Sequence, residues 1–357
     1  MAQPILVINP GSTSTKVAVF EESRRVLEYT VSYSAEALSG FPSIASQYSF
    51  RKLSILSALE ERGFDLSSLA AVVGRGGLLH PIPGGVYRVN QAMKDDLSAA
   101  RYGEHASNLG ALIADDIASS LGIPAFIADP VVVDELSDLA RVSGHALFSR
   151  ISIFHALNQK AVARRYAREQ GKSYESMNLI VAHMGGGVSV GLHKQGRVVD
   201  VNQALSGEGP FSPERSGTLP AGDLVKLCFS GKYSEKEVLR MITGAGGLVS
   251  FLGTNDMRDA EKLYRQGDPK GRLYYEAFIY QVGKAIGAVA AAACGKVDGI
   301  LLTGGIAYST DVVDGLAKMC SFIAPVVSYP GEGELEALAQ AGYGALDGTM
   351  PVREYEA

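Results

Sequence analysis

ILVINPGSTSTKVAVF, from Ile5 to Phe20, contains two apolar runs separated by a turn with four consecutive hydroxyl side chains and a lysine. β-Branched Val17 and Val19 predict that the chain continues after the turn as a strand. The stretch lacks the G-x-x-x-x-G-K-[ST] pattern of a loop that opens a helix. A Gly- and hydroxyl-rich turn exposes backbone N–H groups that suit phosphate oxygens, and Lys16 adds a point charge. The sequence therefore predicts a phosphate-binding β-hairpin, with an ordinary hairpin as the alternative.

The hairpin belongs to a weak internal repeat. Three β segments joined by tight turns occur at residues 5–33 and again from Leu179 in LIVA, HMGGG, VSVGLH, KQG and RVVDVN. Helix-like and strand-like segments alternate after each block, which favours an α/β fold with helices covering the sheets. We expect two duplicated domains, residues 1–150 and 151–335, with a ligand-binding cleft between them. We also expect the C-terminal helix, about 336–357, to pack back on the first domain.

Local signals mark several of these elements. SNLGALIADDIASSLG has apolar residues at helical spacing and ends with Gly122, which predicts a C-terminal cap. SEKEVLRMITG begins with a capping box from Ser234 to Glu237. DGILLTGG and APVVSY predict buried strands.

Composition narrows the class of function. The net charge of −5 over 357 residues argues against a dedicated nucleic-acid or membrane-surface binder. The three cysteines form no C-x-x-C pattern, which fits a reduced, cytoplasmic compartment. The apolar run AIGAVAAAACGKVDGILL is interrupted by Lys296 and Asp298 and is too short to span a membrane.

Two further loops are rich in glycine. HMGGGVSVG places Gly185, Gly186 and Gly187 after a buried strand, where three glycines indicate a close approach by another group. LLTGGIAYS places Gly304 and Gly305 after a third strand. Three such loops after three strands predict a nucleotide site.

These loops resemble the phosphate-1, phosphate-2 and adenosine motifs of the superfamily that contains actin, sugar kinases and acetate kinase. Within it the chain resembles the acetate kinase/butyrate kinase family, and its butyrate-type members most closely. The resemblance covers nearly the whole chain and implies two ribonuclease-H-like (actin-like ATPase) domains. It rests on NPGSTSTK, VVGRGGLLHPIPGGVY, YGEHASNLG, FHALNQKAVAR, VAHMGGG, PERSGTLPAGDL, NDMRDAE and LTGGIAYS, in family order.

The resemblance implies that ATP and a short-chain carboxylate give ADP and an acyl phosphate, reversibly, with Mg²⁺. Butyrate is the expected acid, with branched-chain acids and acetate left open. A carboxylate is ionised at neutral pH, so it needs no general base. Positioning and cationic stabilisation should supply most of the catalysis. A homodimer or a larger homo-oligomer is also implied.

Matching motifs imply roles for individual residues. Arg75 would hold the carboxylate and Phe154 would line the acyl pocket. Arg215 would stabilise the transferring phosphoryl group, with His155 and His183 nearby. Asp129 stands where the family has a catalytic Asp, but the TAFH portion of that motif is missing, so a turn-forming Asp-Pro pair is the alternative.

The nucleotide and metal sites follow in the same way. Asn9 and an acidic residue near the C-terminus would serve Mg²⁺, and the family spacing favours Glu334 over Glu332. Both acids could instead simply favour a helix N-terminus. The implied nucleotide-binding residues are Ser12, Ser14, Lys16, Gly185, Gly186, Gly187, Asp256, Met257, Arg258, Gly304, Gly305 and Ile306.

Two other classes remain open at this point. A sugar kinase of the same fold would need a general base for a hydroxyl, which would make Asp129 essential. A non-enzymatic, actin-type nucleotide-binding protein would have no use for a carboxylate-binding Arg75.

Overall fold

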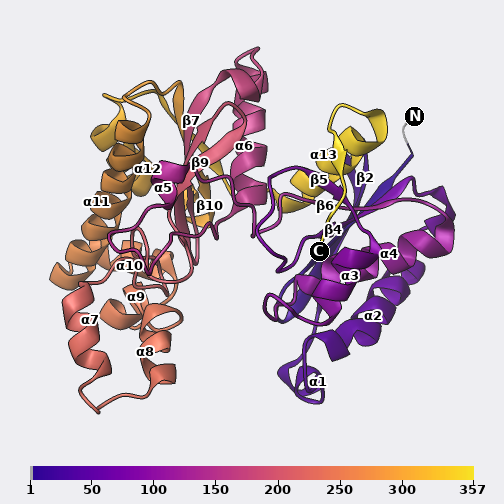
Figure 1. Cartoon of the computed structure of the whole chain (residues 1–357), viewed down its shortest axis with the longest axis horizontal. Coiled ribbons are helices and arrows are strands. Elements are labelled where there is room, and N and C mark those ends of the chain that lie inside the picture. The colour runs from indigo at the N-terminus through magenta and orange to yellow at the C-terminus, as the bar shows by residue number, and fades with distance from the viewer. Residues whose placement is uncertain (1–2) are drawn as a thin grey trace. The chain divides into compact units, whose positions relative to one another are not determined.

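The computed structural model describes residues 3–357. The chain divides into two compact units (Figure 1). Unit 1 comprises the described residues up to Val133 together with Gly333–Ala357, and unit 2 comprises Asp134–Glu332. Unit 2 is therefore inserted into unit 1.

Unit 1 is built on a seven-stranded sheet with the order β12-β5-β6-β4-β1-β2-β3. β1, β2 and β3 are antiparallel neighbours, whereas β1, β4 and β6 are parallel. Every residue of β1 is buried, as expected of a strand covered on both faces. The strands are β1 Ile5–Pro10, β2 Ser14–Glu21, β3 Arg24–Ser32, β4 Ala71–Arg75, β5 Val86–Arg88, β6 Ala125–Ala128 and β12 Val352–Arg353.

Helices cover this sheet. α4 ends at Gly122, whose φ of 69° gives the left-handed cap that the sequence predicts. α13 packs on β1 and β4, and the Tyr343 hydroxyl donates to the Phe20 carbonyl at 2.8 Å. The helices of unit 1 are α1 Ala35–Ser39, η1 Ala45–Gln47, α2 Tyr48–Glu61, η2 Leu66–Ser68, α3 Gln91–Ser98, α4 Asn108–Leu121 and α13 Glu334–Asp347.

Unit 2 is built on a five-stranded sheet with the order β11-β10-β7-β8-β9. β7, β8 and β9 are antiparallel, while β7, β10 and β11 are parallel. The antiparallel block β1-β2-β3 of unit 1 therefore recurs, which confirms the predicted repeat. The strands are β7 Asn178–Met184, β8 Val188–Lys194, β9 Arg197–Val201, β10 Gly299–Gly304 and β11 Val326–Pro330.

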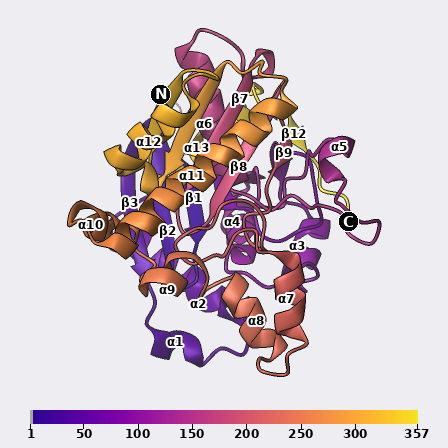
Figure 2. The ribbon, with the colours of Figure 1, turned by 90° about the vertical axis from the view of Figure 1, so that its left-hand side faces the viewer.

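Helices lie on both faces of this sheet (Figure 2). A hydrophobic core lies between the sheet and the helices on each face. α11 and α12 supply Phe278, Val282 and Leu316 to one core, and α6 supplies Ala163 and Tyr166 to the other. The helices of unit 2 are α5 Asp138–Arg141, α6 Ala156–Glu169, η3 Tyr174–Ser176, α7 Ala221–Cys228, α8 Glu235–Ile242, α9 Gly247–Leu252, α10 Met257–Arg265, α11 Pro269–Ala292, η4 Gly305–Tyr308 and α12 Thr310–Cys320.

The division between the units falls before Asp134, earlier than the predicted position near residue 150. Residues between these positions are bonded within unit 2. The Ser137 amide donates to the Val199 carbonyl at 2.9 Å, and the Lys160 ammonium donates to Glu135 at 3.0 Å. These polar contacts have no signature in the composition of the segment, which explains the displaced boundary.

Within residues 3–357, the helices all fall short of the length and apolar character required to cross a membrane.

Candidate functional site

The turn between β1 and β2 is closed by a hydrogen bond from the Gly11 amide to the Ser14 carbonyl at 2.7 Å. Arg51 of α2 lies beneath it, fully buried. Its guanidinium donates to the carbonyls of Gly11 at 2.7 Å and Ser12 at 2.8 Å. Because these carbonyls are bonded on the Arg51 side, the arginine fixes the backbone of the turn.

No acidic side chain among the described residues pairs with Arg51. Arg51 donates to the Gln47 amide oxygen at 3.0 Å and lies 4.7 Å from the centre of the Tyr33 ring. Among the described residues it makes no ion pair, and burial lowers its pKa. A buried cation without an acidic partner favours an anion nearby.

Asn9, Arg75 and Glu334 form the second polar group of unit 1. Asn9 Nδ2 donates to Glu334 Oε2 at 2.7 Å, and Arg75 Nη1 donates to Asn9 Oδ1 at 3.2 Å. Arg75 Nη2 lies 3.2 Å from Glu334 Oε1. Lys16 is the cross-strand partner of Asn9. Three residues from β1, β4 and α13 that the sequence predicts as ligand-binding therefore lie together.

Asp129 adopts a left-handed backbone conformation with φ of 38°. Its carboxylate accepts from the Gly85 amide at 2.8 Å, and its own amide donates to the Gly85 carbonyl at 3.0 Å. The side chain therefore fixes the segment before β5, which agrees with a turn-stabilising role.

His105, in the YGEHASNLG motif, lies close enough to Arg75 to be influenced by its charge. Partial burial and the neighbouring Arg75 guanidinium lower the pKa of His105. Its Nδ1 lies 2.7 Å from the Ser107 hydroxyl. The sequence prediction quoted this motif without singling out the histidine.

In unit 2, His155 and His183 lie face to face. Their rings are stacked with centroids 3.7 Å apart and an angle of 10° between the planes. His155 Nδ1 lies 2.9 Å from the Ser189 hydroxyl, and His183 Nδ1 lies 2.7 Å from the Asn158 amide oxygen. His155 precedes α6 and His183 lies on β7, so both predicted histidines belong to one site.

Arg215 completes this site. A Cβ placed on Gly187 would overlap Arg215 Nη1 and lie 3.4 Å from His155 Cε1, so both side chains converge on Gly187. Arg215 Nη1 donates to the Ala204 carbonyl at 2.7 Å. Its Nε is buried without a hydrogen-bond partner among the described residues. Burial lowers the pKa of Arg215, with a smaller opposing effect of Glu214.

We expect Gly187→Ala to lower kcat by about a hundredfold. The new methyl group must displace the Arg215 guanidinium, and misplacing a catalytic group by about 1 Å can cost about a hundredfold in rate. Gly186→Ala is the matched control, because its Cβ would meet only Glu214 Oε1, at 3.8 Å. Steady-state kinetics of both variants check the prediction. Equal losses in both would show that the loop backbone, not Arg215, is responsible.

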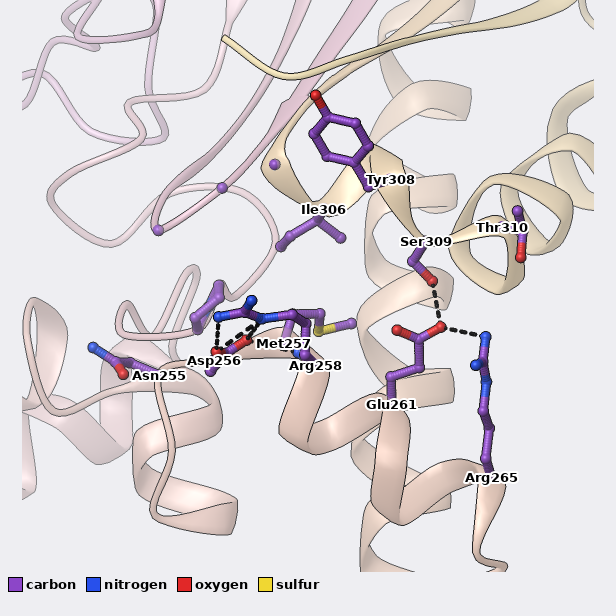
Figure 3. A pocket seen from close by; sticks show the side chains of 14 residues that line it. Asn255, Asp256, Met257, Arg258, Glu261, Arg265, Ile306, Tyr308, Ser309 and Thr310 are labelled. Carbon is purple, nitrogen blue, oxygen red and sulfur yellow. Dashed lines mark hydrogen bonds and ion pairs between the residues drawn. The ribbon is translucent and has the colours of Figure 1, made fainter. Parts of the chain in front are cut away.

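A cavity of about 690 Å³ lies beside this loop (Figure 3). Glu261 Oε1 accepts from the Ser309 hydroxyl at 3.0 Å and from Arg265 Nη2 at 2.7 Å. Asp256 caps α10 and accepts from Arg258 Nε at 2.9 Å. The lining residues are Gly185, Gly186, Pro213, Asn255, Asp256, Met257, Arg258, Glu261, Arg265, Gly305, Ile306, Tyr308, Ser309 and Thr310.

Seven of the predicted nucleotide-binding residues are among those lining residues. Gly304 is not: its φ is 87° and a Cβ there would overlap the Met184 carbonyl, so it permits β10 to approach β7. Phe154 is buried within unit 2. Glu261, Arg265 and Tyr308 line the cavity although the sequence prediction missed them.

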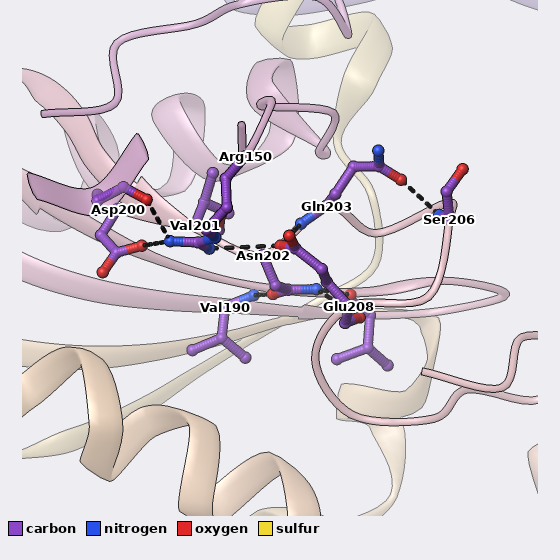
Figure 4. Close-up of polar contacts among 10 residues, drawn as sticks. Arg150, Val190, Asp200, Val201, Asn202, Gln203, Ser206 and Glu208 are labelled. Carbon is purple, nitrogen blue, oxygen red and sulfur yellow. Dashed lines mark hydrogen bonds and ion pairs between the residues drawn. The ribbon is translucent and has the colours of Figure 1, made fainter. Parts of the chain in front are cut away.

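A polar network around Arg150 holds the loop that carries Ala204 (Figure 4). Arg150 donates to Asp200 Oδ1 at 3.0 Å and to the Val201 carbonyl at 2.9 Å. Glu208 Oε2 accepts from the main-chain amide of Gln203 at 2.9 Å. The carbonyl that anchors Arg215 therefore sits in a fixed loop.

Comparison with known proteins agrees with this architecture. A family model described as the Acetokinase family matches residues 146–322. Butyrate kinase 2 of Clostridium acetobutylicum is 55% identical over 99% of both chains. Butyrate kinase 1 of the same organism is 54% identical over 99% of both chains. The crystal structure of Porphyromonas gingivalis acetate kinase has a TM-score of 0.78 at 18% identity, over 96% of this chain and 99% of its own.

The two sheets with their covering helices have the fold of the acetate and propionate kinases of known structure, the actin-like ATPase fold. The near full-length relatives make the assignment narrower: the chain belongs to the acetokinase family, among relatives that are butyrate kinases. The predicted family and fold are thereby confirmed.

Proposed function

We propose that the protein transfers the γ-phosphoryl group of ATP to the carboxylate of butyrate, giving butyryl phosphate and ADP, in a reversible reaction. The observation that carries this proposal is the convergence of Arg215 and His155 on Gly187, with the Nε of Arg215 buried and unpartnered. A buried donor without a partner is costly, and a phosphoryl oxygen would satisfy it.

The bond changes need no proton. One carboxylate oxygen of the acid forms a bond to the γ-phosphorus, and the bond from that phosphorus to the bridging oxygen breaks. The electron pair leaves with the β-phosphate of ADP. Arg215 would compensate the charge spread over the transferring oxygens, and His155 would donate to one of them.

The other predicted residues keep separate roles in this proposal. The cavity lined by Met257, Arg258 and Ile306 has the size and the apolar walls for an adenosine. Ser12, Ser14 and Lys16, on the turn above Arg51, would contact phosphates. Arg75 would hold the carboxylate of the acid, and Phe154 would contact its alkyl chain.

Mg²⁺ is proposed as the metal that accompanies the nucleotide. Asn9 and Glu334 offer an amide oxygen and a carboxylate in contact with each other, the oxygen donors that Mg²⁺ prefers. We favour Glu334 over Glu332 because the Glu334 carboxylate contacts Asn9 at 2.7 Å. Bound Mg²⁺ would neutralise phosphate charge. Cytoplasmic location and a homodimer or larger homo-oligomer stay predictions.

The test is trapping of acyl phosphate as its hydroxamate with ATP and Mg²⁺, over acetate, propionate, butyrate, isobutyrate, isovalerate and glucose. We expect turnover to peak at butyrate. A peak at a branched acid or at acetate would keep the transfer and replace the substrate, since one methylene alters discrimination by only about 1–3 kcal/mol. No hydroxamate from any acid would overturn the proposal.

Arg75→Ala in the same assay distinguishes the role of Arg75 in binding the acid from the role of Arg215 in the transfer. We expect the KM for butyrate to rise by about a hundredfold while the KM for ATP changes little, as for loss of a charged contact to a carboxylate. Arg88→Ala is the control, because Arg88 lies on β5 with an exposed side chain. An unchanged KM for butyrate in Arg75→Ala would remove Arg75 from the acid site.

A further inference from the structure

A chain of hydrogen bonds leads away from His155 into the core of unit 2. Ser189 Oγ, 2.9 Å from His155 Nδ1, accepts from Gln159 Nε2 at 2.8 Å. Gln159 Oε1 lies 3.0 Å from His193 Nε2, and His193 Nδ1 lies 2.7 Å from the Tyr174 hydroxyl. Ser189, Gln159 and His193 are fully buried, so the chain is closed to water along these residues.

The orientation of the Gln159 amide is fixed by the main chain. Its nitrogen also donates to the Ser189 carbonyl at 3.1 Å. A carbonyl can only accept, so the amide cannot be turned over without losing this bond. The Gln159 oxygen therefore faces His193, and because that oxygen can only accept, His193 must carry a proton on Nε2.

The position of each following proton is then determined. Complete burial, Lys160 and Arg164 lower the pKa of His193 well below its ordinary value, so this ring is neutral. Its Nδ1 then accepts from the Tyr174 hydroxyl. At the other end, Ser189 Oγ accepts from Gln159, and among the described residues His155 Nδ1, at 2.9 Å, is the one acceptor within reach of the Ser189 hydroxyl proton. A buried hydroxyl proton without an acceptor is costly, which favours donation from Ser189 to His155 Nδ1.

His183 is fixed in the opposite sense. Asn158 Nδ2 donates to the Glu332 carbonyl and to Thr303 Oγ1, the latter at 3.2 Å. The Asn158 oxygen consequently faces His183 Nδ1 at 2.7 Å, and that nitrogen must donate. The hydrogen-bond partners therefore favour opposite tautomers in the two stacked rings.

We propose that Ser189, Gln159 and His193 are positioning residues that hold neutral His155 with its proton on Nε2, while Asn158 holds neutral His183 with its proton on Nδ1. The stacked pair then presents one hydrogen-bond donor, from His155, and one acceptor, from His183. The catalytic meaning of the donor rests on the proposed phosphoryl transfer, whereas the tautomers themselves do not.

A neutral donor suits the surroundings of His155. Parallel rings 3.7 Å apart disfavour two positive charges, and Arg215 adds a third close by. With the proton held on Nε2, the neutral ring can donate from that nitrogen. The titratable or charged groups around the chain are His183 on β7, Arg215 and Glu214 on the 212–217 turn, Lys160 and Arg164 on α6, Tyr174 on η3 and Glu135 beside Lys160.

The direct test is a two-dimensional ¹⁵N correlation spectrum of the ¹⁵N-histidine-labelled full chain without ligands at pH 7.5. The six histidines are assigned with single His→Gln variants. We expect Nε2–H for His155 and His193 and Nδ1–H for His183. An imidazole in water prefers its proton on Nε2. The Nδ1–H form of His183 is therefore the result that distinguishes the proposal from an unconstrained ring. A His155 with its proton on Nδ1, or a His183 with its proton on Nε2, would overturn the proposal.

Variants test whether the chain acts on catalysis. We expect Ser189→Ala to lower kcat by about threefold to tenfold at pH 8 with little change in KM, and by less at pH 6. The protonated ring donates through Nε2 in either case, so the loss is confined to the neutral form. Ser189→Thr keeps the hydroxyl and should restore activity and the His155 signal.

Ser152→Ala is the matched control, because the Ser152 hydroxyl is buried without a hydrogen-bond partner among residues 3–357. Equal losses at both pH values with an unchanged His155 signal would make Ser189 merely structural and overturn the positioning role. The spectrum requires no turnover, so a failed acyl phosphate assay would leave the tautomer result standing and would remove only the proposed function.

Discussion

Arg215→Ala is expected to lower kcat by about a thousandfold, with a much smaller effect on either KM. Removing one donor aimed at charge that develops in a transition state costs about a hundredfold to a thousandfold. Here the lost group is a full cation, and it converges with His155 on Gly187. Steady-state kinetics with ATP and the best acid of the substrate panel measure both constants.

Two further variants test whether the loss of kcat is due to the guanidinium of Arg215. Arg215→Lys keeps the charge without the planar donor set and should recover only part of the loss. Arg272→Ala is the control, because Arg272 lies exposed on α11 and, among the described residues, forms an ion pair with Glu276 alone, one turn away at 2.9 Å. A rise in the KM for ATP with kcat preserved would mean that Arg215 binds the ground state instead.

Arg51→Met is the second large effect that we expect. The variant keeps much of the buried volume but removes the donors to the Gly11 and Ser12 carbonyls. Groups left without partners cost about 1–3 kcal/mol each, so we expect the free energy of opening β1 and β2 to fall by about 3 kcal/mol. Amide hydrogen exchange on these strands measures it.

Loss of Arg51 should also weaken nucleotide binding. Its charge has no acid partner in the described part of unit 1, so bound phosphates would provide the counter-charge. We expect the KM for ATP to rise at least about tenfold, as for the loss of a buried charge. Arg62→Met is the control: Arg62, at the end of the same helix, lies 4.5 Å from the Tyr29 ring centre but is exposed. Matching effects in both variants would contradict a special role for Arg51.

Much of the fold could be predicted from local sequence. The hairpin forms with Ile5 opposite Phe20, and the capping box joins Ser234 to Glu237 through both of its bonds. Such signals are short in range, because the residues that cause them lie within one helix turn or within two strands joined by a tight turn. The predicted buried strand DGILLTGG is confirmed in β10, and APVVSY is confirmed as a strand in β11. The predicted burial of APVVSY is wrong, because β11 lies at the edge of its sheet and only its Tyr329 is buried.

The missed residues depend on contacts between distant segments. Arg51 shares the buried face of α2 with Ile55 and Leu59, at helical spacing, and this was an available signal of burial. No motif in the sequence connects Gln159, Ser189 and His193. They form a chain only because the Gln159 side chain of α6 bonds to both β8 residues in the folded protein. Phe154 is a buried side chain, and its contact with the ligand stays a prediction, because spacing cannot distinguish a core residue from a pocket wall.

The order in which the chain leaves the ribosome differs from the order in which its units can be completed. β1 and β2 are synthesised early, but unit 1 gains α13 and β12 only after all of Asp134–Glu332 has been made. Domains generally fold as units during synthesis. Unit 2 can therefore finish first, while the early strands wait for α13 to cover β1 and β4. Because Glu334 arrives on that helix, the Asn9–Arg75–Glu334 group is assembled at the end of folding, and a nascent chain has no complete version of it to use.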